Sequence, residues 1–163
     1  MKRIIDLLKT VNRPGVDNVV KYIQDSDFAT ARCGRHHTYK GGLVDHLLEV
    51  YEIMMREHSH LPKESIIVCA LLHDLDKAKL RGWYFRGKHP ACVIPILKRC
   101  GFELTEDEAF AIRNHHSPTA DLITHPYRRA LSDADMESTG EWRKAHCNPT
   151  GKDILLGVLR KFL

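Results

Sequence analysis

Residues 69–80 read CALLHDLDKAKL, and they place a histidine–aspartate pair, His73 and Asp74, within an otherwise apolar run. The apolar residues before the pair recur at the spacing of a helix that turns a face to a core. His73 and Asp74 continue that face, and Lys77 follows about one turn later. A buried carboxylate is costly unless a partner compensates its charge. The stretch therefore predicts a central helix whose ionisable residues meet partners from elsewhere in the chain.

Composition limits the classes of protein to which the chain can belong. Its 163 residues suffice for one domain with a substantial core, and no run approaches the roughly 18 to 20 apolar residues of a membrane span. Asp6 and Lys9 interrupt the short apolar run at the N-terminus, so we expect no signal peptide. The five cysteines include no CxxC pair, which favours free thiols in a cytoplasmic protein. The net charge of +4 permits anionic partners, and 11 histidines are unusually many.

Helical spacing dominates the chain, and no convincing strand pattern occurs. Thr105 begins a capping box, TEDE, in front of one helix, and Pro126 begins the next. The polar stretch 25–42 is expected to be an irregular loop. Apolar residues at helical spacing predict helices within 16–23, 43–54, 66–71, 93–97, 105–117, 126–134 and 154–162. The predicted fold class is all-α, in one compact helical domain.

Ionisable residues on at least four of these helices fall on the inward faces. Because side chains three, four or seven residues apart share a face, the inward positions are His46, His73, Asp74, His115, His116, Asp133 and Asp135. Taken singly, such a histidine is more often a core residue with a satisfied hydrogen bond. Together, neutral imidazoles and carboxylates are the ligands that Zn, Mn, Fe, Co or Ni accept. The set therefore predicts a metal centre between the helices.

The order of these residues resembles the HD superfamily of metal-dependent phosphohydrolases, in which a first His, an adjacent His-Asp and a distant Asp lie on helices. HHTYKGGLVDHLLEVY at 36–51 resembles the opening segment of the HD domain in bacterial 3′-to-5′ exoribonucleases and in stand-alone bacterial and phage HD hydrolases. KHP at 88–90 and AIRNHH at 111–116 resemble the additional histidines of two-metal HD phosphodiesterases. The resemblance covers roughly 26–139, the core of a single HD-domain helical bundle over 1–163 with flanking N- and C-terminal helices.

The resemblance implies a set of metal ligands and a mechanism. One divalent ion would be held by His46, His73, Asp74 and Asp135, and Asp74 would bridge to a second ion held by His89, His115 and His116. Two such ions activate water and neutralise the charge that develops on phosphorus. Asp74 and Lys77 would be the catalytic residues, with Lys77 on a phosphate oxygen. The family takes one or two ions, of Mn, Fe, Ni, Co, Zn or Mg.

The implied substrate is a nucleotide, another phosphorylated small molecule, or a short linear or cyclic single-stranded oligonucleotide. The reaction would be hydrolysis of a phosphoester or phosphoanhydride bond. Besides Lys77, the candidates for substrate binding are His37, Arg113 and Tyr84. The main alternative is a non-catalytic sensor that binds a metal and a nucleotide with the same fold. A metal-stabilised interaction module is a third interpretation, and it predicts a closed coordination shell.

The chain departs from the family pattern at two positions. Asp76 stands where related chains often have Gly in an HDxGK pattern, next to the lysine that would bind phosphate. The final ligand is ambiguous, because SDAD offers Asp133 as an alternative to Asp135, which we favour. No GYP sequence follows His116, which argues against a cyclic di-GMP specialist. Motifs for a serine nucleophile, a P-loop or a dinucleotide fold do not occur.

Overall fold

The computed structural model describes residues 1–83, 89–117 and 125–146, and within these ranges the chain is helical and forms no strand. In the described residues, two short 3₁₀ helices, η1 (Phe28–Thr30) and η2 (Leu75–Lys77), accompany seven α-helices. The α-helices are α1 (Lys2–Leu8), α2 (Val16–Asp25), α3 (Gly42–Glu57), α4 (Lys63–Leu72), α5 (Val93–Arg99), α6 (Glu106–Asn114) and α7 (Pro126–His146). The predicted all-α fold class is confirmed. The helix expected at 154–162 lies outside the described residues.

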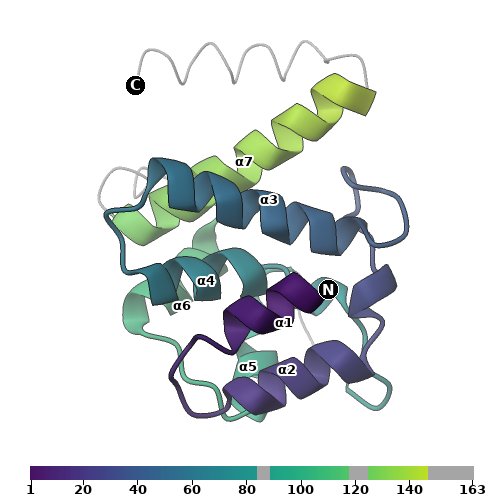
Figure 1. The fold of residues 1–163 in the computed structure, drawn as a ribbon, viewed down its shortest axis with the longest axis vertical. Helices are drawn as coiled ribbons and strands as arrows, with labels where there is room; N and C mark the ends of the chain where they lie inside the picture. Colours follow the sequence, from purple (N-terminus) through teal and green to yellow (C-terminus); the bar gives the residue numbers. More distant parts are fainter. Residues whose placement is uncertain (84–88, 118–124, 147–163) are drawn as a thin grey trace.

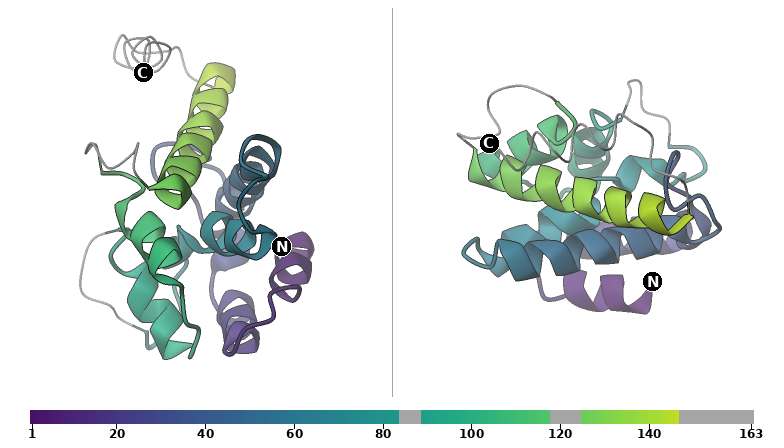
Figure 2. Two further views of the ribbon diagram at one scale, coloured as in Figure 1. Left: turned by 90° about the vertical axis from the view of Figure 1, so that its left-hand side faces the viewer. Right: turned by 90° about the horizontal axis from the view of Figure 1, so that it is seen from above.

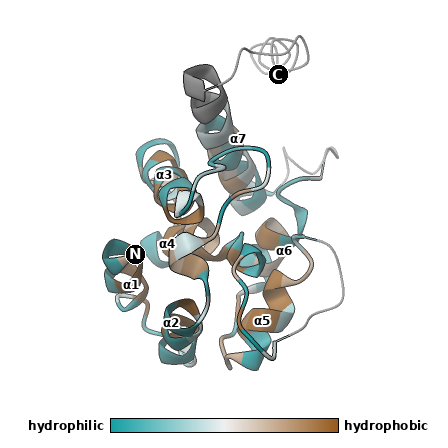
Figure 3. Ribbon diagram, turned by 90° about the vertical axis from the view of Figure 1, so that its right-hand side faces the viewer, coloured by the Kyte–Doolittle hydropathy of each residue, from teal (hydrophilic) through white to brown (hydrophobic). Residues whose placement is uncertain are grey.

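Helix α4 lies at the centre of the bundle. Helices α3 and α7 run side by side along one side of the molecule, and α4 contacts α1, α3, α6 and α7 (Figures 1 and 2). Every residue of α4 from Ser65 to Leu72 is buried. Apolar residues on α4, α5 and α6 are visible in Figure 3. A helix that is apolar on all sides is stable only inside a core, so α4 takes the central place that its sequence predicts.

The His–Asp pair lies at the end of α4 rather than inside a helix. The α-helix ends at Leu72, His73 is its C-cap, and Asp74 begins the 3₁₀ turn that contains Lys77. The chain leaves the helix with Asp74 at φ −111° and ψ 17°, outside the helical range. This break matters for the site, because it directs the two oxygens of Asp74 toward two different groups of side chains.

The loop before α3 is irregular, as expected, apart from η1. Its end depends on two glycines: Gly41 has φ +87°, which other residues rarely adopt, and a Cβ on Gly42 would lie 2.0 Å from the carbonyl oxygen of His37. His37 itself has φ 44°. The Leu43 amide donates to the Ala31 carbonyl, which fastens the loop to the start of α3. The loop therefore brings its histidines against the helix that carries His46.

The two predicted helix starts around α6 and α7 are confirmed. Thr105 accepts a hydrogen bond from the Glu108 amide while the Glu108 side chain bonds the Thr105 amide, so the capping box is complete. Pro126 is the first residue of α7.

The described cysteines (Cys33, Cys69, Cys92 and Cys100) are buried free thiols. None of the helices in the described part of the chain is both long and apolar enough to cross a membrane.

Candidate metal centre

The first cluster of possible metal ligands joins α3, the end of α4 and α7. One donor atom from each of His46, His73 and Asp135 lies within 4.8 Å of the others, and all three residues are buried. His46 Nε2 is 3.2 Å from Asp135 Oδ1, and His73 Nε2 is 3.9 Å from the same oxygen. Helical spacing on three separate helices predicted these three side chains, and the fold brings them together.

The second cluster lies beside the first and reaches the surface. It combines donor atoms of Asp74, His89, His115 and His116, again within 4.8 Å of one another. His89 Nε2 is 3.1 Å from Asp74 Oδ1 and 3.0 Å from His116 Nε2. His115 is buried, whereas the side chain of His116 is 49% exposed. The second cluster can therefore be approached from solvent.

Asp74 faces both clusters at once. Its Oδ2 lies 3.6 Å from His46 Nε2 and 3.8 Å from His73 Nε2, while its Oδ1 faces His89. Lys77 forms an ion pair with Oδ2 and is the cation closest to this carboxylate in sequence. One carboxylate with its two oxygens in two donor clusters has the arrangement of a bridging ligand.

Helix ends fix the imidazoles of His73 and His115 in the same way. Each is the C-cap of its helix, and each places Nδ1 next to the carbonyl three residues earlier: 3.0 Å to Ala70 for His73 and 2.7 Å to Ile112 for His115. These carbonyls lack helical partners, so they accept the Nδ1–H. Nε2 of each ring then carries the lone pair that a metal ion requires.

Two successive hydrogen bonds, through Ser138 to Glu49, orient the His46 ring at Nδ1. His46 Nδ1 lies 3.0 Å from Ser138 Oγ, and that hydroxyl donates to Glu49 Oε2 at 2.8 Å. Because the hydroxyl hydrogen goes to Glu49, Ser138 accepts the Nδ1–H of His46 and leaves its Nε2 unprotonated. Glu49 lies one turn after His46 on α3, and no pattern in the sequence indicates its role.

Buried atoms without hydrogen bonds concentrate at this site. In the described residues, five buried side-chain nitrogen or oxygen atoms have no hydrogen-bond partner, and four of them are His46 Nε2, His73 Nε2, Asp74 Oδ1 and His115 Nε2. The fifth, Glu64 Oε1, lies in the first turn of α4 and is 3.2 Å from the Arg13 guanidinium. His46 Nε2 and Asp74 Oδ1 likewise have polar neighbours, Asp135 Oδ1 at 3.2 Å and His89 Nε2 at 3.1 Å, without forming a hydrogen bond. Such atoms are costly unless something compensates them. Three imidazole nitrogens and a carboxylate oxygen are suitable donors for a divalent transition metal.

The protonation states of these residues suit metal binding. Burial lowers the pKa of His73, and it lowers the pKa of His115 to about 3, so both imidazoles are neutral near neutral pH. Burial alone would raise the pKa of Asp74, but the adjacent His73 imidazole and the ammonium of Lys77 outweigh it and hold the pKa well below its ordinary value. Ligands that are already neutral imidazoles and ionised carboxylates lose no proton when a cation binds.

Asp76, where the sequence departs from the family pattern, contacts the second cluster. Its Oδ1 lies 2.9 Å from His89 Nδ1, and its side chain is buried. Burial lowers the pKa of His89, but this hydrogen bond and the charge of Asp74 outweigh it and raise the pKa overall. Asp76 thus holds the ring of His89 by Nδ1 and directs Nε2 toward Asp74.

A buried arginine supports the turn that carries His115 and His116. Arg128 on α7 is fully buried, and its guanidinium donates to the carbonyls of Asn114, at 2.9 Å, and Ser117. A cation at the C-terminal end of a helix satisfies carbonyls that have no helical partner. Arg128 therefore fixes α7 to the end of α6, where the two histidines emerge.

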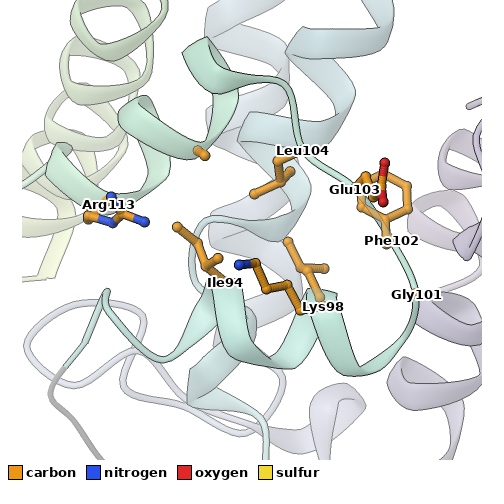
Figure 4. Close-up of a pocket in the computed structure, with 9 residues that line it drawn as sticks. Ile94, Lys98, Gly101, Phe102, Glu103, Leu104 and Arg113 are labelled. Atoms are coloured by element: carbon orange, nitrogen blue, oxygen red, sulfur yellow. The ribbon is translucent and has the colours of Figure 1, made fainter.

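The remaining predicted residues lie in different surroundings. His37 is buried beside the first cluster, with its ring centre 5.3 Å from that of His46. The Asp133 side chain is 38% exposed and lies 3.7 Å from the Arg129 guanidinium. Arg113 lines a separate pocket of about 450 Å³ between α5 and α6, together with Lys98 (Figure 4). Tyr84 lies outside the described residues.

One group of donors near the site was not expected from the sequence. Cys33, His36 and His46 each place a possible ligand atom within 4.8 Å of the others, and all three are buried. Cys33 and His36 lie in the loop before α3, where no helical period indicates which way a side chain points. Their only sequence signal is proximity to His37.

A scan of protein-family models found no matching family, and searches of curated proteins and of solved structures found no significant match.

Proposed function

We propose that this protein is a metal-dependent phosphohydrolase of the HD type. The observation that carries the proposal is the position of Asp74, whose two oxygens face two adjacent clusters of imidazole and carboxylate donors. In two-metal hydrolases, a carboxylate in such a position binds both metal ions, one through each oxygen. The order and spacing of the ligands in the sequence support the same family.

Each cluster would bind one divalent ion. His46, His73 and Asp135 would hold the first ion together with Oδ2 of Asp74, and Asp135 is preferred to Asp133 because its side chain is buried against both histidines. The second ion would be held by Oδ1 of Asp74 and by the set His89, His115 and His116. Bound ions would supply Lewis acidity at the phosphate and would lower the pKa of a water molecule that they bind.

Lys77 would change partner when the centre is loaded. Its ammonium pairs with Asp74 Oδ2, the same oxygen that faces His46 and His73. With a divalent ion held at this oxygen, like charge would weaken the ion pair with Asp74, and the Lys77 ammonium would be available to bind a phosphate oxygen. The side chain is 20% exposed, so it can reach a substrate from this position.

A pocket beside the second cluster supports a nucleotide-sized substrate. It measures about 590 Å³ and is lined by Lys77, Lys79, Trp83 and His89 among others. Pockets for small ligands commonly span about 300 to 1,000 Å³. Lys77, Lys79 and Arg81 line the pocket together with Trp83, so its wall combines an aromatic ring with positive charge. The pocket suits a phosphate near Lys77 and a planar base near Trp83.

The surface access of His116 bears on the alternatives. A purely structural metal site has a closed shell, whereas a catalytic site keeps an open position for water or substrate. His116 is half exposed and the pocket adjoins His89, which favours a reactive site over an interaction module. A nucleotide sensor would have the same access, so turnover has to separate the enzyme from the sensor.

The test combines metal analysis with turnover. We expect purified protein to contain one or two divalent ions and to hydrolyse bis(p-nitrophenyl) phosphate or a member of a nucleotide panel. Asp74→Asn, which keeps the shape but removes the bridging charge, should lower turnover at least about 100-fold. The matched control is Asp25→Asn, which changes an exposed aspartate on α2 that pairs with Lys21.

Two results would overturn the proposal. Protein that binds no divalent ion would remove the metal centre, and equal turnover by wild type and Asp74→Asn would remove the mechanism. Full metal content without turnover on any phosphate ester would favour the nucleotide sensor.

A further inference from the structure

We infer that Cys33 and His36 are additional ligands for the metal ion at His46 and make this position a thiolate-containing site. The cluster consists of Cys33 Sγ and ring nitrogens of His36 and His46, all within 4.8 Å of one another. Cys33 and His46 are fully buried and His36 is 9% exposed. Among the described cysteines, Cys33 is the one that joins a candidate metal cluster.

A second observation points to a ligand at this place. His46 Nε2 is buried and has no hydrogen-bond partner, while Nδ1 of the same ring is occupied by Ser138. His46 therefore has one nitrogen to offer, Nε2, and a single lone pair binds a single ion. The thiol and His36 accordingly extend the coordination of one ion, and they do not define a separate ion.

Hydrogen bonds prepare His36 for this role. His37 Nε2 lies 3.0 Å from Glu49 Oε2, and His37 Nδ1 lies 3.0 Å from His36 Nδ1. A carboxylate accepts only, so Nε2 of His37 carries the hydrogen and a neutral His37 accepts at Nδ1. His36 then donates from Nδ1 and keeps a lone pair at Nε2. The row Glu49–His37–His36 thus resembles the carboxylate–histidine pairs that support metal ligands.

The backbone fixes Cys33 relative to the same residues. The Cys33 amide donates to the His37 carbonyl at 3.3 Å, and that carbonyl packs against Gly42, where no Cβ is tolerated. Cys33 and His36 are therefore held in one tight turn against the start of α3. Two donors from one rigid turn lose little conformational freedom when a cation binds.

A thiolate changes which metal the centre prefers. Sulfur ligands favour Zn²⁺, Fe²⁺ and Co²⁺, whereas Mg²⁺ prefers oxygen ligands. On binding, the Cys33 thiol would release its proton to solvent and the sulfur would coordinate as a thiolate. The expected consequence is that Cys33→Ala weakens Zn²⁺ binding about tenfold or more while the weaker Mg²⁺ binding changes little.

The inference rests on the proposed metal centre but not on hydrolysis, and cobalt spectroscopy of the whole chain tests it. We expect Co²⁺-loaded wild type to show visible d–d bands and a near-ultraviolet cobalt–thiolate charge-transfer band. Cys33→Ala should lose the charge-transfer band and keep the d–d bands. The matched control, Cys100→Ala, removes another buried thiol and should keep both.

The outcomes separate this inference from the proposed function. Visible bands without a charge-transfer band in wild type would overturn the role of Cys33 and leave the metal centre standing, as would a band that persists in Cys33→Ala. Failure to bind cobalt or zinc would overturn both proposals. Should Cys33→Ala not fold, zinc X-ray absorption of wild type decides: a sulfur neighbour at about 2.3 Å supports the inference, and a shell of nitrogen and oxygen alone overturns it.

Discussion

At the N-terminal end of helix α6, Glu108 is fully buried and protein groups meet both of its oxygens. The Arg13 guanidinium donates to them at 2.6 Å and 2.9 Å, and the Thr105 amide donates to one at 3.0 Å. At the C-terminal end of the same helix, His115 is buried with its Nε2 unpartnered. Burial of an ionisable group therefore does not by itself indicate a functional site. The difference lies in whether the protein completes the hydrogen bonds of that group.

The largest effect on stability is expected from a substitution of Glu108, at the N-terminal end of α6, where the protein satisfies the buried group. Glu108→Gln keeps a side chain that can form the capping box, but it leaves the Arg13 guanidinium, 18% exposed, with much less negative charge around it. Removing one partner of a buried ion pair costs about 3–5 kcal/mol. Denaturant unfolding should show this loss equally in EDTA and in saturating Zn²⁺. A loss confined to the metal-loaded protein would contradict the structural role of Glu108.

The opposite end should respond to metal instead. His115→Gln removes an imidazole nitrogen from the second cluster, and we expect metal affinity to fall at least about 100-fold, which corresponds to about 2.7 kcal/mol of binding free energy. In saturating Zn²⁺ the free energy of unfolding should therefore fall by about 2.7 kcal/mol relative to wild type. The loss in EDTA should be much smaller. Equal losses in both conditions would assign His115 to the core alone.

The two ends should also separate by pH in the metal-free protein. Burial lowers the pKa of His115 to about 3 from 6.5, so between these values the unfolded chain binds more protons than the native protein. The free energy of unfolding then falls as the pH drops below 6.5, by about 1.4 kcal/mol per pH unit for such a histidine. His36 and His73 act in the same direction, and His89 in the opposite one.

Glu108 contributes in a different pH window. Burial would raise its pKa, but hydrogen bonds from Arg13 and from the Thr105 amide outweigh it and lower the pKa below 4.5. Its contribution is complete above 4.5 and is lost as the pH falls through the lowered pKa. Denaturant unfolding in EDTA between pH 7 and pH 5 should thus show a shallower slope for His115→Gln than for wild type. Glu108→Gln should keep the wild-type slope, and a parallel change in both variants would contradict the assignment.

Helical periodicity explains what the sequence could predict. The inward direction of His46, His73 and Asp135 followed from the rule that side chains three or four residues apart share a face, whereas their grouping as one set of ligands was implied by the resemblance to the HD superfamily. The same rule also pointed Asp133 inward, and the structure leaves its side chain 38% exposed. The capping box at Thr105 could also be predicted, because it involves only neighbouring residues. The pairing of Glu108 with Arg13 could not be predicted, since the two residues are 95 positions apart in the sequence.

Helical periodicity could not predict the donor atoms in the loop before α3 or the residues that orient the ligands. The direction of Cys33 and His36 depends on the backbone of one turn, which Gly42 allows by bringing the chain close to the His37 carbonyl. Glu49 faces Ser138 only because α3 packs along α7. No pattern within either segment encodes such contacts.

A substitution of Asp76 is expected to have the smallest effect on metal affinity, and it tests how the second cluster is held in place. It was singled out as a departure from the HDxGK pattern, and the structure gives it a partner, the Nδ1 of His89. Asp76→Gly restores the common residue but releases this ring, so metal affinity should fall about 10-fold, close to 1.4 kcal/mol, without a change in the number of ions bound. Isothermal titration with Zn²⁺ measures both quantities.

Asp76→Asn serves as the control, because its amide oxygen still accepts the hydrogen bond from His89 Nδ1 and the variant should retain most of the affinity. Equal affinity in Asp76→Gly and wild type would mean that the neighbours of His89, including Asp74 and His116, orient its ring without Asp76.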